Sequence, residues 1–220
     1  MKHAHAHPWY VRQGLGLALL AICLASLVGQ VLVGHAAWNE ERADAGLSPL
    51  GLVAYLESGH FVSATFENWE SEFLQMGMYV LLTVWLRQQG SAESRPLDPA
   101  EEEERVAPGV APAWATVGGW REFLYSNSLA IAFFLLFAAS FLAHLDGSWR
   151  HELDERAMKG KPAIALWDHF TSSQFWFESF QNWQSEFLSV LAIVVLSIFL
   201  RQRNSPQSKP VRAPHHQTGT

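Results

Sequence analysis

The residues best suited to chemistry in this chain occur twice, in nearly the same order. The spacing i, i+3, i+4 and i+7 places four polar side chains on one helix face, first in Asn68, Ser71, Glu72 and Gln75 and, 114 positions later, in Asn182, Ser185, Glu186 and Ser189. Each set contains one carboxylate. Two carboxylates brought together inside a protein are suited to binding a proton or a small cation.

The elements that carry these polar faces are apolar. The runs Leu15–Val33 and Leu129–Leu145 are nearly continuous, whereas Phe73–Leu86 and Phe187–Leu200 each contain about 14 residues, short of the roughly 20 that span a bilayer. The two shorter runs reach full length only if the polar segments before them also lie at membrane depth. We therefore expect the polar faces at the outer ends of spans two and four.

Composition supports a membrane protein. Hydrophobic residues make up 49% of the chain and charged residues 16%, against about 25% charged in a typical soluble domain. The net charge of −6 without a basic stripe argues against a nucleic-acid partner. One cysteine excludes a disulfide scaffold.

An internal repeat organises the chain. Sliding the sequence by 114 positions aligns residues 13–97 with 127–211 without a gap, and about 26 of the 85 pairs are identical. The pattern predicts an all-α, integral membrane four-helix bundle built from two tandem, parallel two-helix repeats, with short interfacial helices near 50–56 and 164–170 in the outer loops. The predicted segments are a cytoplasmic N-terminus (1–12), a first repeat (13–89), a disordered acidic Pro-rich cytoplasmic linker (90–116), a second repeat (117–203) and a disordered cytoplasmic tail (204–220).

Orientation follows from the basic residues. The N-terminus, the segment between spans two and three, and the chain after span four hold about ten of the fifteen Lys and Arg residues, so both termini are predicted to be cytoplasmic. Arg87 and Arg201 directly follow apolar helix ends, and Trp69 and Trp183 suit the opposite interface as anchors. A secretory signal peptide is the competing interpretation of the first run, which is about 19 residues long against the 7–15 of a signal core.

Two roles are open for the polar faces. In the structural one, Asn, Ser and Glu side chains hydrogen-bond between helices and hold the two repeats together. In the functional one, Glu72 and Glu186 line a central proton or cation site on the pseudo-symmetry axis. His35 and His144 are not equivalent in the repeat, so we expect interfacial histidines rather than ligands of a metal or haem.

The doubled motif supports a resemblance. The twice-repeated Asn-Trp-x-Ser-Glu-Phe, followed by an apolar run and Leu-Arg-Gln-x-x-Ser-x-x-Ser-x-Pro, resembles a family of uncharacterised bacterial four-span membrane proteins classed as a domain of unknown function. The likeness covers residues 11–214. It implies a location in the bacterial cytoplasmic (inner) membrane and implies no activity.

No motif indicates an enzyme. A nucleophile elbow, a Gly-rich phosphate loop and a complete His-Glu-x-x-His are all missing from the sequence, so we expect no cofactor and no metal. The leading hypothesis is a non-enzymatic membrane protein with a structural or accessory role. The alternative is a small proton- or cation-conducting transporter or channel that uses Glu72 and Glu186, and a third is a sensor that reports through the linker. The expected partners are the lipid bilayer and a second copy or another membrane protein.

Overall fold

The computed structural model describes residues 8–98 and 108–219, and this part of the chain is helical without a strand. The all-α prediction is thus confirmed. Four helices are long: α2 (Gly14–Asp44), α4 (Gly59–Trp85), α6 (Ser128–Met158) and α8 (Ser173–Phe199). The others are short: α1 (Trp9–Arg12), α3 (Leu52–Leu56), the 3₁₀ turn η2 (Ala113–Ala115), α5 (Gly119–Ser126) and α7 (Leu166–Phe170).

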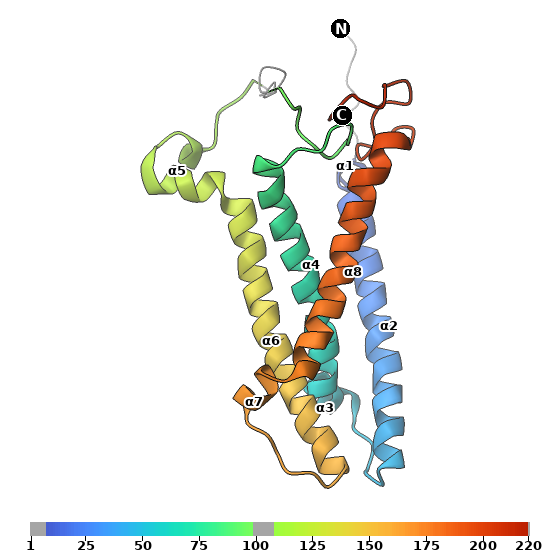
Figure 1. Cartoon of the computed structure of the whole chain (residues 1–220). Coiled ribbons are helices and arrows are strands. Elements are labelled where there is room, and N and C mark those ends of the chain that lie inside the picture. Colours follow the sequence, from blue (N-terminus) through green and yellow to red (C-terminus); the bar gives the residue numbers. More distant parts are fainter. Residues whose placement is uncertain (1–7, 99–107, 220) are drawn as a thin grey trace.

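The long helices run alongside one another, and the short ones gather at their two ends (Figure 1). We call the end that holds α3 and α7 the loop end. The opposite end, where α1, α5 and the C-terminal segment lie, is the terminal end. The short helices predicted near 50–56 and 164–170 are confirmed as α3 and α7.

Three of the long helices are apolar enough to cross a membrane. They are α2, α6 and α8, which indicates a membrane protein. Helix α4 has the same length as α8 but is not among the three, because polar side chains recur along it. The outer segments 68–72 and 182–186 are helical, as predicted.

The helix bounds of the two halves differ by one constant offset. Helices α2, α3 and α4 begin and end 114 residues before α6, α7 and α8. The local bonds correspond as well: the hydroxyls of Ser58 and Ser172 each accept the N–H of the residue three positions on. Gly46 and Gly160 follow the ends of α2 and α6 with φ of 73° and 63°, where the left-handed conformation favours glycine.

Helices α4 and α6 make backbone-to-backbone contact near the loop end. A Cβ on Gly59 would lie 2.3 Å from the His151 backbone nitrogen, and one on Gly147 would lie 2.6 Å from that of Ser63. Small residues permit such close approach between membrane helices. Helix α2, in contrast, buries only Trp38. The α4–α6 pair is therefore the scaffold on which the other elements are placed.

The terminal end is closed by chain segments that we expected to be disordered. The N–H of Gly90 donates to the Thr218 hydroxyl (2.9 Å), and the N–H of Gly219 donates to the carbonyl of Ser91 (2.9 Å). Lys209 is only 1% exposed.

The buried ammonium of Lys209 explains how the tail keeps a defined shape. It donates to three carbonyls, those of Pro214, His215 and Gln217. These bonds satisfy the ammonium and fix a loop that composition alone assigns to disorder. The acidic run at 101–104 and residues 1–7 lie outside the described residues.

Candidate functional site

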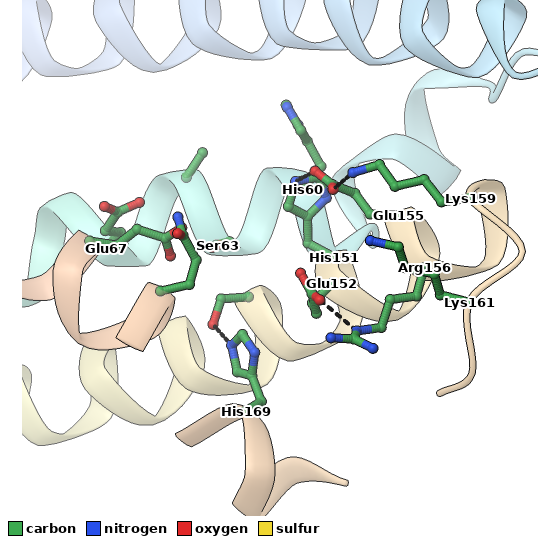
Figure 2. Close-up of a pocket in the computed structure, with 14 residues that line it drawn as sticks. His60, Ser63, Glu67, His151, Glu152, Glu155, Arg156, Lys159, Lys161 and His169 are labelled. Carbon is green, nitrogen blue, oxygen red and sulfur yellow. Dashed lines mark hydrogen bonds and ion pairs between the residues drawn. The ribbon is translucent and has the colours of Figure 1, made fainter. Parts of the chain in front are cut away.

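A polar pocket opens at the loop end between α4, α6, α7 and α8. Its volume is about 500 Å³, within the range of small-molecule sites. Three histidines line it, His60 from α4, His151 from α6 and His169 from α7 (Figure 2). The charged side chains in its wall are Glu67, Glu152, Glu155, Arg156, Lys159, Lys161 and Glu178.

Part of this charge is paired within the wall. Arg156 Nε donates to Glu152 Oε1 at 2.6 Å, and Lys159 donates to Glu155 one helical turn earlier. His169 is nearly buried and its Nε2 lies 2.8 Å from the Ser148 hydroxyl. Burial lowers the pKa of His169 below its usual 6.5, since desolvation disfavours the imidazolium form. His169 is therefore neutral at pH 7.

A buried acid–base pair lies deeper in the bundle. Glu70 of α4 and His144 of α6 are both fully buried, with Glu70 Oε2 and His144 Nδ1 3.1 Å apart. The second oxygen of Glu70 accepts the indole N–H of Trp183 from α8 at 3.2 Å. The His144 ring stacks on Phe175, with centroids 5.0 Å apart. Three helices thus converge on one carboxylate.

One ring nitrogen of this pair has no partner. His144 Nε2 is buried and makes no hydrogen bond within the described residues. An unpaired buried polar atom costs free energy comparable to a lost hydrogen bond, so the site retains capacity for one more proton or polar group. His144 is bonded to a neighbouring helix and is fully buried between helices, and its expected place near the membrane interface stays a prediction.

Glu67 connects the pocket to this pair. It lies one turn before Glu70 on α4, lines the pocket and accepts a hydrogen bond from the Asn182 amide of α8. Along α4, from the loop end inward, the pocket therefore comes first, then Glu67 and then Glu70.

A second cluster of rings fills the space between α2, α4 and α6. Trp38 is fully buried and stacks on His60, with centroids 5.0 Å apart, and His151 packs against both rings. The Tyr55 hydroxyl lies 3.3 Å from His60 Nδ1. The histidines on this side of the pocket are therefore held by aromatic packing.

The eight residues of the predicted polar faces occupy different environments. Ser71, Gln75, Asn182 and Glu186 are buried or half-buried, whereas Asn68, Glu72, Ser185 and Ser189 are exposed. Asn68, Ser71, Ser185 and Ser189 bond to carbonyls of their own helices. The polar faces therefore lie only partly toward the neighbouring helices.

The predicted anchors also differ from one another. Trp69 is 40% exposed, while Trp183 turns inward to Glu70. Arg87 and Arg201 each donate to three carbonyls around the ends of α4 and α8, at corresponding positions.

Sequence reasoning did not single out Glu67 or Glu70, and it did not pair His144 with a carboxylate. A signal for part of the site exists in α4, where every fourth residue is polar: Ser63, Glu67, Ser71, Gln75, Tyr79 and Thr83. Residues four apart form one ridge of a helix. That ridge begins in the pocket and continues to the terminal end, where the Tyr79 hydroxyl donates to Glu93 at 3.2 Å.

Comparison with known proteins places the chain in a family. The family described as Domain of unknown function (DUF6766) matches residues 6–220. The chain belongs to that family. Neither the comparison with curated proteins nor the comparison with solved structures found a match.

The match covers the pocket, the buried pair and the polar ridge of this DUF6766 chain together. Among the described residues, no group of three or more His, Cys, Asp and Glu side chains is placed to hold a metal ion.

Proposed function

We propose that this chain is a four-span protein of the bacterial inner membrane, with the terminal end in the cytoplasm and the loop end outside. Three apolar helices support the proposal, as does the excess of Lys and Arg predicted on the cytoplasmic side. Helix α4, packed on α6 and α8, supplies the fourth span, and its polar ridge is shielded from lipid in part by these neighbours. Two tandem two-helix units account for the constant offset of 114 residues.

Within this framework the chain conducts protons or a small cation, using Glu67 and Glu70. The observation that carries the proposal is the fully buried Glu70–His144 pair. Ionisable side chains inside a membrane protein are costly and mark proton and ion pathways by default. Glu70 and His144 share a hydrogen bond, so a proton taken up on one is passed to the other without leaving the buried site.

The pocket supplies the entrance. Glu67 is in its wall and is one helical turn from Glu70, about 5 Å along the axis. Beyond the pair, Ser71 and Gln75 continue the α4 ridge as buried polar groups. Steps of four residues, about 6 Å, are short enough for one water molecule to bridge. Tyr79 and Glu93 form the exit at the terminal end.

Proton flux into proteoliposomes tests this pathway. The purified chain is reconstituted with a pH-sensitive dye inside, and a potassium gradient with valinomycin drives proton entry. We expect E70Q and Q75L each to reduce the flux at least about tenfold, the effect of about 1.4 kcal/mol on a barrier. Thermal unfolding of each variant verifies that it remains folded.

The sequence-derived acids provide the matched control. Glu72 is exposed and lies off the ridge, so the double variant E72Q/E186Q should retain flux close to that of the unmodified chain. If the double variant loses flux and E70Q keeps it, the pathway lies where the sequence alone suggested. If liposomes that contain the unmodified chain show no more flux than empty liposomes, the chain does not conduct protons.

A structural or accessory role is the second candidate, and the surface of α2 favours it. Residues 15–26 of this helix are exposed on every side within the chain, so lipid or another membrane protein covers them. Crosslinking in native membranes from the unique Cys23, which is exposed on α2, tests whether another membrane protein covers this surface. A crosslinked dimer or hetero-complex would support the accessory role, and exclusively monomeric protein would oppose it.

A further inference from the structure

The charges in the wall of the loop-end pocket do not cancel evenly. Arg156 is paired with Glu152, and Lys159 with Glu155. The charges that have no ion-pair partner within the described residues are those of Glu67, Glu178 and Lys161. Within the described residues, Glu67 and Glu178 bond only to the amides of Asn182 and Gln174, which carry no charge.

These uncompensated charges are separated in space. Glu67 lies at one side of the pocket, and Lys161 lies at the other, beyond the histidines (Figure 2). Glu178 of α8 is close enough to Glu67 for their charges to interact. The pocket therefore has an acidic side facing the bundle and a basic side toward the loop that follows α6.

The wall between the two sides is aromatic and polar. His60 and His151 contribute their rings there, backed by Trp38, and His169 is held by Ser148. Such a wall contacts a short carbon chain without adding a fixed charge. A cavity of about 500 Å³ holds a molecule of several heavy atoms together with some water.

We infer that the pocket binds a small zwitterion, with its ammonium group beside Glu67 and Glu178 and its carboxylate beside Lys161. A simple anion meets two carboxylates at the acidic side, and a simple amine leaves Lys161 without a counter-charge. Only a molecule with both groups matches the charge at both sides, and such complementarity gives specificity. The site shares Glu67 with the proposed conduction pathway, whereas Glu178 and Lys161 belong to the ligand site alone.

Calorimetric titration of the full chain in lipid nanodiscs tests the inference. The probes are γ-aminobutyrate and its two single-charge analogues, butylamine and butyrate, with β-alanine and ε-aminocaproate as a shorter and a longer zwitterion. At least one zwitterion should bind about tenfold more tightly than either analogue, as expected for one added charge-assisted hydrogen bond. Equal Kd values for zwitterions and analogues, or binding by none of the five probes, would overturn the inference.

Two variants locate the ends of the ligand. E178Q should weaken zwitterion and butylamine binding about fivefold or more and leave butyrate unchanged, while K161Q should weaken zwitterion and butyrate binding and leave butylamine unchanged. E40Q, an exposed acid on α2, is the matched control and should bind like the unmodified chain. Zwitterion binding that is insensitive to both E178Q and K161Q contradicts the site.

Proton flux measured on the same variants separates the two proposals. E178Q and K161Q should keep their flux, because neither side chain bonds to Glu67, Glu70 or His144 within the described residues. Zwitterion binding without flux rejects the conduction proposal and retains this one. Flux without zwitterion binding rejects the binding proposal alone.

Discussion

At the loop end, the two halves share one backbone arrangement but place different side chains on it. At corresponding positions, 114 residues apart, the first half has Gly34, Trp38, Tyr55 and His60, and the second has Ser148, Glu152, His169 and Gln174. In the first half the rings of Trp38, Tyr55 and His60 pack in one cluster beside Gly34, and His60 also lines the pocket. In the second they line an open polar pocket.

The bonds that hold the backbone are the same in both halves. His35 Nε2 bonds to the carbonyl of Leu50 (2.7 Å), and the Trp149 indole, at the corresponding position, donates to that of Ile164 (3.0 Å). Different ring types thus serve one loop geometry. The comparison teaches that the pocket results from the side chains filling the space under the loop, since the loop itself does not change.

The largest expected effect on stability comes from replacing Trp38, and the corresponding Glu152, with alanine. Trp38→Ala removes a fully buried ring and should lower the free energy of unfolding by about 3 kcal/mol or more. Glu152→Ala, at the corresponding position, removes one partner of a partly exposed pair with Arg156 and should cost about 1 kcal/mol or less. Chemical denaturation in detergent measures both. Similar losses for the two variants would show that the halves do not differ in packing.

An intermediate effect on stability is expected at Gly34, which faces Tyr55. A Cβ on Gly34 would lie 2.2 Å from the Tyr55 hydroxyl oxygen, so Gly34→Ser should destabilise the chain by about 1–3 kcal/mol. The double variant Gly34→Ser/Tyr55→His copies the Ser148–His169 pair and should recover at least half of that loss. Double-mutant-cycle analysis of unfolding measures the coupling. Additive losses of stability from the two substitutions would mean that a Ser–His pair like Ser148–His169 does not fit the first half.

The smallest effect is a pH dependence of opposite sign at the corresponding positions Tyr55 and His169. Burial raises the pKa of Tyr55 above 10.0 in the folded chain, so its stabilisation is present below pH 10.0 and is lost as the pH rises. Burial lowers the pKa of His169 below 6.5. The unfolded chain then binds more protons, and stability falls as the pH drops below 6.5.

Thermal unfolding scans of two variants separate these contributions. Tyr55→Phe should flatten the alkaline decline in Tm by a few degrees without affecting the acid side. His169→Asn should flatten only the acid decline. If either variant changes both limbs, the two positions are not independent and the comparison of the halves fails at this point.

Much of the fold could be predicted from the sequence. The self-alignment at 114 and the apolar runs predicted helices at the observed places, including α3 and α7, because periodicity and length are local properties of the chain. The structure of the C-terminal tail could not be predicted in this way. Its compact loop depends on the buried ammonium of Lys209 bonding to carbonyls five to eight residues away, and composition does not reveal such bonds.

The candidate site was only partly predictable, and α4 shows why. Spacing alone places Glu72 on the same face as Asn68 and Ser71, but it does not say which face meets α6. That choice is made by Gly59 and Gly147, whose close contact turns Glu70 inward and leaves Glu72 exposed. The partner, His144, comes from a helix 74 residues away, beyond the reach of any local pattern.

The loose attachment of α2 has a consequence for work on the protein outside its membrane. Trp38, near the loop end, is the one residue of α2 that is buried, and Gln30 donates to Thr65 of α4, while the first half of α2 presents Leu, Ile and Val in every direction. Acyl chains or another membrane protein must therefore cover that half. Short-chain detergents should release α2 before they disturb the α4–α6 pair, so nanodiscs or native-lipid extraction are the conditions in which all four long helices keep their places.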